Sequence, residues 1–354
     1  MSLGPDLIGG GHPPLFWPDI DVYFQRDLNQ AFRLIDKIAE AGGRYLKGAV
    51  LHRESLCLKN AGRVSYYDKS KNEAVSEPFE NVIARHVVPL ESLRKVMNHA
   101  RDTGLNVVLS VYDTEGLAFA KAVGALAVKI PSSNITHKAL IDAVAESELP
   151  MVIDTGRSKF REIERAVGWA RQKGAGARLV IQHSPPGPPA HASRFHLRMM
   201  PYMSEVFSCP VGLSDHHSGL AMLSLAVALG ASVVEKGLVV DDAQTDIDVA
   251  HALPVSRLRE ALTILDESWC ALGESIRPDA EAPASPVDRM CIIARRGIAE
   301  GEVITWDALD FAFPPVGIGA EEIDSLLGAR AIVPISCGES IKWADISVAE
   351  SGDV

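Results

Sequence analysis

The stretch Val211-Gly-Leu-Ser-Asp-His-His-Ser-Gly219 combines a short apolar run with a cluster of chemically reactive side chains. Ser214, Asp215 and His216 follow the apolar residues directly, and a segment of small residues with helical spacing begins after Gly219. This order is typical of a βα unit, in which polar groups at the carboxyl end of a strand lie beside the start of the next helix. The stretch therefore predicts a functional site at the rim of an α/β fold.

Similar apolar runs recur between residues 45 and 236, separated by segments with helical periodicity. We predict strands at Tyr45–Leu51, Asn106–Val111, Ala125–Ile130, Pro150–Asp154, Arg178–Gln182, Val211–Leu213 and Ser232–Glu235, and an eighth at Pro14–Ile20. We predict helices at Glu91–Thr103, His137–Glu148, Lys159–Lys173 and Ser218–Leu229. Eight βα units favour a (β/α)8 TIM barrel over an open doubly wound sheet.

Composition narrows the class of protein. The chain has 354 residues, 47% of them apolar and 23% charged, which are the values of a globular protein with more than one core. No apolar run approaches the ~20 residues that cross a bilayer, and the first residues lack the features of a secretory signal, so we expect a cytoplasmic protein without membrane contact.

A net charge of -11 without a basic stripe argues against nucleic-acid binding. Five scattered cysteines argue against disulfides and a thiolate zinc site.

A proline- and alanine-rich segment, Arg277–Pro286, is typical of a linker. We therefore predict a barrel domain at residues 1–275, a linker at 276–288 and a small β-rich domain at 289–354, where short Ile/Val runs alternate with glycine-rich turns. The polar segment Arg53–Val88 interrupts the βα pattern, which predicts a long functional loop or lid. We identify no internal repeat.

Polar side chains stand at or just past the predicted carboxyl ends of the strands. They are Lys47, Ser110, Asp113, Lys129, Ser132, Ser133, Asp154, Thr155, His183, Ser214, Asp215, His216, Glu235 and Lys236. A lysine inside an apolar strand, such as Lys129, is costly to bury unless a carboxylate or a bound anion meets it. Two interpretations stay open: internal ion pairs, or a phosphate or carboxylate site made by lysines and serine hydroxyls.

Some of these residues have further interpretations. His183 fits a structural, hydrogen-bonded histidine as well as it fits a site residue. Lys236 has the further option of forming a Schiff base with a carbonyl substrate if burial lowers its pKa. We expect His12, His52, His86, His99 and His137 to be structural or surface residues.

Several motifs resemble those of the sialic acid synthases, a family that includes spore coat polysaccharide biosynthesis protein E. They are Val128-Lys-Ile-Pro-Ser-Ser133, Asp154-Thr-Gly156, Gly212-Leu-Ser-Asp-His216 and Val233-Val-Glu-Lys236. Past the linker, Ala294-Arg-Arg-Gly-Ile-Ala-Glu-Gly-Glu-Val303, Gly317-Ile318, Leu326-Leu-Gly328 and Gly338-Glu339 resemble the family's C-terminal antifreeze-like (SAF) module. The resemblance covers roughly residues 28–350.

The resemblance implies condensation of phosphoenolpyruvate with an N-acylated hexosamine similar to N-acetylmannosamine, giving a nine-carbon 2-keto acid. It implies that Lys47, Ser110, Lys129, Ser132 and Ser214 bind phosphoenolpyruvate, that Asp248 contacts the sugar and that His216 binds Mn2+ or Mg2+. Glu235 and Lys236 match the Glu-Lys pair of the last strand. We assign catalytic roles to Lys47, Lys129, Asp215, Glu235 and Lys236, and count Asp154 and His183 with the substrate-binding residues. The family also implies a homodimer with exchanged C-terminal modules.

The chain departs from the family pattern at six places. Gly237 replaces the second metal histidine, Ala49 a glutamine, Asn134 a glutamate, Asp154 a serine and Phe313 an arginine, and Pro14–Ile20 lacks the family's Ala-Glu-Ile-Gly with its strand-one glutamate. These departures leave three hypotheses. The chain is a synthase, a catalytically impaired paralogue that binds a ligand or partner, or a Schiff-base aldolase that uses Lys236 or Lys129.

Overall fold

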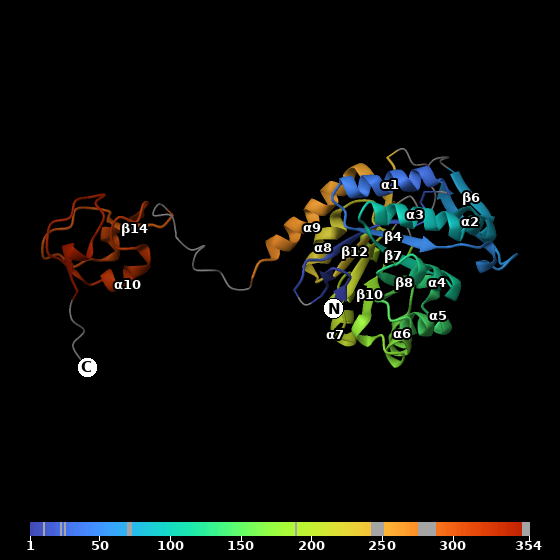
Figure 1. Ribbon diagram of the computed structural model, residues 1–354. Coiled ribbons are helices and arrows are strands. Elements are labelled where there is room, and N and C mark those ends of the chain that lie inside the picture. The colour runs from blue at the N-terminus through green and yellow to red at the C-terminus, as the bar shows by residue number, and fades with distance from the viewer. Residues whose placement is uncertain are drawn as a thin grey trace. The chain divides into compact units, whose positions relative to one another are not determined.

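The structure is a computed structural model that describes residues 1–9, 11–21, 23–24, 26–68, 73–187, 190–241, 251–274 and 288–348. The chain divides into two compact units, residues 1–273 and 274–354 (Figure 1). The predicted linker at 276–288 lies almost wholly outside the described residues. Within the described residues, no helix is both long and apolar enough to cross a bilayer.

The first unit is the predicted (β/α)8 barrel. Its strands are β3 (Leu15–Asp21), β4 (Tyr45–Val50), β7 (Asn106–Val111), β8 (Ala127–Ile130), β9 (Met151–Asp154), β10 (Leu179–His183), β11 (Val211–Asp215) and β12 (Val233–Val239). All neighbouring pairs are parallel, and β12 pairs with both β11 and β3, which closes the sheet. The barrel interpretation is therefore confirmed, including the eighth strand near the N-terminus. A short strand β13 (Leu253–Pro254) pairs in parallel with the carboxyl end of β12.

Helices follow the strands and cover the outside of the barrel. They are α1 (Leu28–Glu40), α3 (Leu90–Asp102), α4 (Thr114–Ala122), α5 (Lys138–Glu146), α6 (Phe160–Gln172), α7 (Met199–Phe207), α8 (Ala221–Ala228) and α9 (Leu258–Leu272). Helix α1 shows why they form. Asp27 caps its first turn by accepting a hydrogen bond from the Asn29 amide, and its buried residues Ala31, Leu34, Ile35 and Ile38 follow helical spacing.

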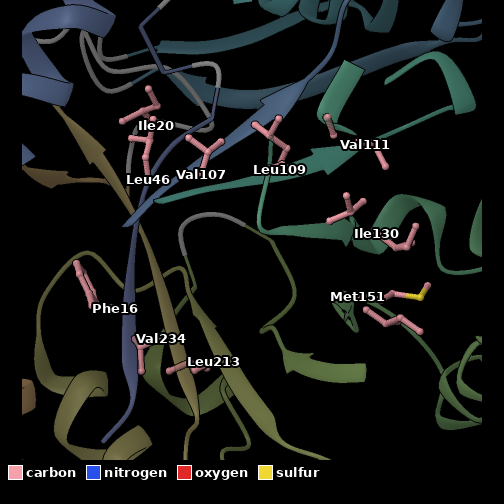
Figure 2. Packing of buried hydrophobic residues seen from close by; sticks show 14 of the residues in the cluster. Phe16, Ile20, Leu46, Val107, Leu109, Val111, Ile130, Met151, Leu213 and Val234 are labelled. Carbon is pink, nitrogen blue, oxygen red and sulfur yellow. The ribbon is translucent and has the colours of Figure 1, made fainter. Parts of the chain in front are cut away.

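Alternate residues of each strand face outward and pack beneath the helices. Figure 2 shows members of this apolar layer, such as Ile20, Leu46 and Val234, which are fully buried. The intervening residues face the barrel interior, since side chains alternate along a strand. At the amino end of the barrel they form a separate apolar cluster that includes Trp17, Tyr45 and Val152.

An N-terminal hairpin closes this end of the barrel. Its strands β1 (Ser2–Leu3) and β2 (Asp6–Leu7) are antiparallel, and Leu3 and Ile8 are buried in the same cluster as Trp17 and Tyr45. The Tyr45 hydroxyl donates to a carboxylate oxygen of Asp6 at 2.6 Å. The hairpin therefore functions as a plug.

Residues 51–68 and 73–88, between β4 and α3, belong to an excursion with its own secondary structure. The predicted long loop or lid contains an antiparallel hairpin of β5 (Arg63–Asp68) and β6 (Glu73–Pro78), and then helix α2 (Phe79–His86). The Val88 amide donates to the Leu51 carbonyl at 2.9 Å, so the two ends of the excursion meet.

The second unit contains two small antiparallel sheets. One pairs β14 (Cys291–Ala294) with β15 (Leu309–Ala312), and the other pairs β16 (Arg330–Ala331) with β17 (Ile346–Ser347). The short helix α10 (Ile323–Leu326) supplies the buried Leu326 to a core rich in isoleucine. The small β-rich domain is therefore confirmed as a fold.

This unit contains a repeat that our sequence analysis missed. Gly301-Glu-Val-Ile-Thr-Trp306 matches Gly338-Glu-Ser-Ile-Lys-Trp343. Both glycines have φ near +80°, which a side chain at Cβ would strain, and both isoleucines are fully buried. Each glutamate accepts a hydrogen bond from the amide three residues before it.

The plug predicts a clear contrast in stability. Leu3→Ala should lower the free energy of unfolding by about 2–5 kcal/mol, because it leaves a cavity against Trp17 and Tyr45. Leu7→Ala, in the same hairpin but 52% exposed, should change it by no more than about 0.5 kcal/mol. Urea denaturation followed by circular dichroism measures both, and equal effects would contradict the plug.

Candidate active site inside the barrel

Each of the eight barrel strands contributes one polar side chain to the interior, above the apolar cluster. The eight are Asp19, Lys47, Ser110, Lys129, Asp154, Gln182, Ser214 and Glu235, and all are at most 5% exposed. Seven of them stand two positions beyond a member of this apolar cluster, as Lys47 does beyond Tyr45, and Ser214 stands two positions beyond Gly212, so strand alternation brings them inside. We call these residues the polar layer.

Lys129 lies between two carboxylates of the polar layer. Its Nζ is 2.8 Å from Asp154 Oδ2 and 2.6 Å from Glu235 Oε1. The Ser214 hydroxyl donates to the same Glu235 oxygen at 3.0 Å. The buried ammonium group thus joins β8, β9 and β12, and Glu235 links this group to Ser214 on β11.

Lys47 has a similar environment two strands away, since only β7 separates β4 from β8. Its Nζ is 3.0 Å from Asp19 Oδ2 and 3.3 Å from Asp21 Oδ2. Asp19 was not among the predicted site residues, because Pro18-Asp-Ile-Asp21 differs from the Ala-Glu-Ile-Gly that the family resemblance implies. A strand-one carboxylate is present as an aspartate.

Burial and crowding shift the pKa values of these groups. Burial, with help from Asp21 and Glu235, raises the pKa of Asp19 to about 7 despite its contact with Lys47. Burial also acts to raise the pKa of Glu235, but Lys129 and Lys47 lower it to about 2. Burial acts to lower the pKa of Lys129, yet Asp154 and Glu235 raise it overall. Near neutral pH, Glu235 and Lys129 are charged and Asp19 can exchange a proton.

Asp215 and Lys236 face away from the polar layer. They are register partners on β11 and β12, directly after Ser214 and Glu235, so alternation turns them outward. Lys236 Nζ is 2.8 Å from Asp215 Oδ2 and donates to the His217 carbonyl at 2.6 Å. Asp215 Oδ1 accepts from the His217 amide at 2.8 Å. The pair therefore holds the turn on which His216 stands.

His216 lies at the mouth of the barrel beside Ser214 and His251. Its Nε2 is 3.3 Å from Ser214 Oγ, and its ring centroid is 4.9 Å from that of His251. Burial lowers the pKa of His216, so its ring is neutral near pH 7. Among the described residues, its buried Nδ1 finds no hydrogen-bond partner. A neutral imidazole with a spare nitrogen suits a metal ligand.

The remaining predicted residues are dispersed. Ser132 begins a short 3-10 turn (Ser132–Asn134) after β8, where a Cβ on Gly156 would lie 3.1 Å from its hydroxyl oxygen. His183 turns outward and donates from Nε2 to the Phe195 carbonyl at 2.5 Å, the arrangement of a structural histidine. Asp248 lies outside the described residues.

A second cluster, His52, Asp113 and Glu115, stands past the ends of β4 and β7. Within the described part of the chain, these three could offer ligand atoms to one cation, since the atoms lie within 4.8 Å of one another. Asp113 already bonds to the guanidinium of Arg53 and caps α4 through the Gly116 amide. His52 was predicted to be a structural or surface residue, because its approach to Asp113, 61 residues away, is not visible in the sequence.

A closed parallel barrel with buried lysines and carboxylates near the carboxyl ends of its strands has the architecture of a TIM-barrel enzyme. The NeuB family profile matches residues 34–277, and the SAF domain profile matches residues 289–347. The chain belongs to the NeuB family, whose members are phosphoenolpyruvate-dependent synthases of nonulosonic acids and use a divalent metal.

Curated relatives are similar along nearly their whole length. N,N'-diacetyllegionaminic acid synthase from Legionella pneumophila is 26% identical over 90% of this chain and 91% of the relative. Spore coat polysaccharide biosynthesis protein SpsE from Bacillus subtilis is 24% identical over 99% of this chain and 98% of the relative. Human N-acetylneuraminate-9-phosphate synthase is 23% identical over 94% of this chain and 93% of the relative.

Solved structures share the fold. The sialic acid synthetase of Leptospira borgpetersenii, crystallised with citrate, has a TM-score of 0.69 at 23% identity and covers 79% of this chain and 93% of its own. The Bacillus subtilis SpsE structure has a TM-score of 0.65 at 22% identity and covers 99% of both chains.

The outward ion pair leads to a stability prediction. Lys236→Met should lower the free energy of unfolding by about 3–5 kcal/mol, because Asp215 is left buried without a counter-charge. The double variant Lys236→Met/Asp215→Leu should recover part of that loss. Lys37→Met, which removes a pair with Glu40 at the exposed surface, should change it by about 0.5 kcal/mol or less. Urea denaturation separates these outcomes, and a Lys236→Met effect as small as the control would refute the role of the pair.

The raised pKa of Asp19 predicts that stability depends on pH. The folded protein keeps this proton up to about pH 7, whereas an unperturbed aspartate loses it near 3.8, so the folded state binds more protons in this window. The contribution of Asp19 is therefore most favourable below about pH 4 and is lost as the pH rises through 7. Asp19→Asn removes this titration, so urea denaturation at pH 5 and pH 8 should show the variant gaining stability relative to wild type at the higher pH. A constant difference would exclude the shift.

Proposed function

We propose that the chain condenses phosphoenolpyruvate with the open-chain aldehyde of an N-acylated hexosamine, similar to N-acetylmannosamine, and releases phosphate and a nine-carbon 2-keto sugar acid. The observation that carries this proposal is the pair of buried ammonium groups, Lys47 and Lys129, inside a barrel mouth that also contains the hydroxyls of Ser110 and Ser214. Family membership and the names of the relatives support the same reaction class.

The polar layer supports binding of an anionic substrate, whose negative groups would replace the internal carboxylates as partners of the two lysines. Phosphoenolpyruvate carries a phosphate and a carboxylate, which the two lysines neutralise in place of their internal carboxylates. Asp19 can take up a proton near neutral pH, and this releases the Lys47 charge for the substrate. Ser110, Ser132 and Ser214 then donate hydrogen bonds to the bound anion.

The reaction needs one new carbon–carbon bond and one proton at the former aldehyde oxygen. C3 of phosphoenolpyruvate bonds to the aldehyde carbon, and the oxygen of a water molecule bonds to C2. The bond between C2 and the bridging phosphate oxygen then breaks, so that phosphate leaves and C2 becomes a keto carbon; one proton of the water ends on the former aldehyde oxygen and the other leaves with the phosphate. Asp19 is suited to supply or accept the proton, since its pKa lies near the working pH. Glu235 stays charged and fixes Lys129, while Asp215 and Lys236 position the turn that carries His216.

His216, at the mouth of the barrel, suits a divalent metal, because its Nδ1 is buried without a hydrogen-bond partner among the described residues. When bound, Mn2+ or Mg2+ would polarise the aldehyde oxygen. Asp248, outside the described residues, keeps its proposed contact with the sugar, and a homodimer with exchanged C-terminal modules remains a prediction for light scattering to test.

The contact between Asp154 and Lys129 favours one alternative, a paralogue that binds a ligand without turnover. Asp154 already pairs with the Lys129 ammonium group that the substrate phosphate would need. A Schiff-base aldolase has less support, since a nucleophilic lysine must be neutral. The pKa of Lys129 is raised by its carboxylates, and Lys236 is fully buried in its pair with Asp215.

A phosphate-release assay tests the proposed function. Wild-type protein with phosphoenolpyruvate, Mn2+ and a panel of N-acylated hexosamines should release phosphate with at least one sugar. Lys129→Ala should abolish this release and also phosphoenolpyruvate binding in calorimetry, because its ammonium group is lost. No release with any sugar, together with retained phosphoenolpyruvate binding, would instead establish the binding paralogue.

Asp154 should limit the affinity for phosphoenolpyruvate. Asp154→Ser removes the carboxylate 2.8 Å from Lys129 and should tighten binding by about tenfold or more, since a charged hydrogen bond contributes roughly 1.5–3 kcal/mol. Asp142→Ser, which breaks the corresponding pair with Lys138 on α5, is the matched control and should leave the affinity unchanged. Calorimetry measures both, and an unchanged affinity for Asp154→Ser would place the substrate away from Lys129.

A further inference from the structure

Gly237 leaves room on β12 that another aromatic side chain fills. A Cβ at this position would lie 3.0 Å from Cε2 and 3.3 Å from Cζ and Oη of Tyr23. The Tyr23 ring therefore packs directly against the backbone at the position where the family resemblance implies a second metal histidine. A histidine could not enter here unless Tyr23 moved.

A histidine from a different segment stands next to Tyr23. His251 precedes β13, which continues along the far end of β12. Its ring is 2% exposed, lies 6.1 Å from that of Tyr23 with an interplanar angle of 81°, and lies 4.9 Å from that of His216 with an angle of 62°. Tyr23 and His251 thus occupy together the space around Gly237 and His216.

We propose that His216 and His251 together bind one divalent cation of the Mn2+ class, with His251 replacing the histidine that β12 lacks. This inference rests on the proposed function, because it concerns the metal that such a synthase uses. Two observations carry it: the two imidazoles lie close enough to share an ion, and His216 Nδ1 is buried without a hydrogen-bond partner among the described residues. A buried polar atom without a partner calls for an explanation, and coordination of a cation by this nitrogen would provide one.

The two histidines suit a metal better than the other candidate cluster does. Imidazole is a common ligand of transition metals and binds in its neutral form. In the cluster of His52, Asp113 and Glu115, the guanidinium of Arg53 already neutralises Asp113. A cation there would have to displace that contact, whereas at His216 no described cationic side chain contacts the ring nitrogens.

Titration of the full-length protein with Mn2+ alone, followed by the electron paramagnetic resonance signal of free Mn2+, tests the site without any turnover. Wild type should bind one Mn2+, and His251→Gln and His216→Gln should each weaken binding by at least tenfold, the lower end of the loss found for outer-shell changes at metal sites. His99→Gln is the matched control, since His99 bonds to Asp36 on the outside of the barrel, and it should bind as wild type does. Asp113→Asn should also leave binding unchanged.

Moving the histidine from position 251 to position 237 tests the site by restoring metal binding, so the test does not depend on a loss that misfolding could also cause. His251→Ala/Gly237→His/Tyr23→Ala moves the imidazole to β12 and makes space for it, so it should restore binding to within tenfold of wild type. His251→Ala/Gly237→His, which keeps Tyr23 in place, should bind more weakly than the triple variant. Circular dichroism identifies variants that fail to fold.

Two results would overturn the inference: no Mn2+ binding by wild type, or wild-type affinity in folded His251→Gln. Loss of binding in Asp113→Asn but not in His251→Gln would place the ion at the other cluster and would overturn it as well. Calorimetry with phosphoenolpyruvate in the absence of metal reports separately on the lysines. The metal inference and the proposed function can therefore fail independently.

Discussion

The interior of the barrel depends on the mutual neutralisation of Lys47 and Lys129 with the carboxylates around them. A buried ammonium group or carboxylate alone would be too costly to keep charged, so each requires the other to be in place. Lys129 contacts residues of β9 and β12, and Lys47 contacts β3. The closed barrel therefore requires a strand order and a side-chain alternation that bring opposite charges of this layer next to one another.

The inner and outer faces of β11 and β12 carry charged residues with different roles. Glu235 faces inward to Lys129, while its neighbour Lys236 faces outward to Asp215 and the carbonyl of His217. Consecutive residues of one motif thus serve opposite sides of the sheet. The outward pair holds the turn that carries His216, so the position of the proposed metal ligand depends on an ion pair outside the polar layer.

Sequence patterns predicted the fold because the strands alternate clearly and their order along the chain is their order in the barrel. They also identified Lys47, Lys129, Ser214 and Glu235 as strand-end residues, and alternation could have separated Glu235 from Lys236. Asp19 was missed because its motif differs from the family's at three of four positions. The approach of His251 to His216 depends on tertiary packing between residues 35 positions apart, and that of His52 to Asp113 on packing between residues 61 positions apart. Neither contact leaves a local signal in the sequence.

The excursion after β4 begins and ends at one backbone hydrogen bond, from Val88 to Leu51. Its hairpin and α2 therefore leave the barrel and return to it at the same point. The length of the excursion thus does not change the positions of the barrel strands before and after it. Such a segment can be lengthened, shortened or exchanged at little cost in chain entropy. Evolution can thus remodel what stands over the carboxyl ends of β4 and β7 while the charged interior stays under separate constraint.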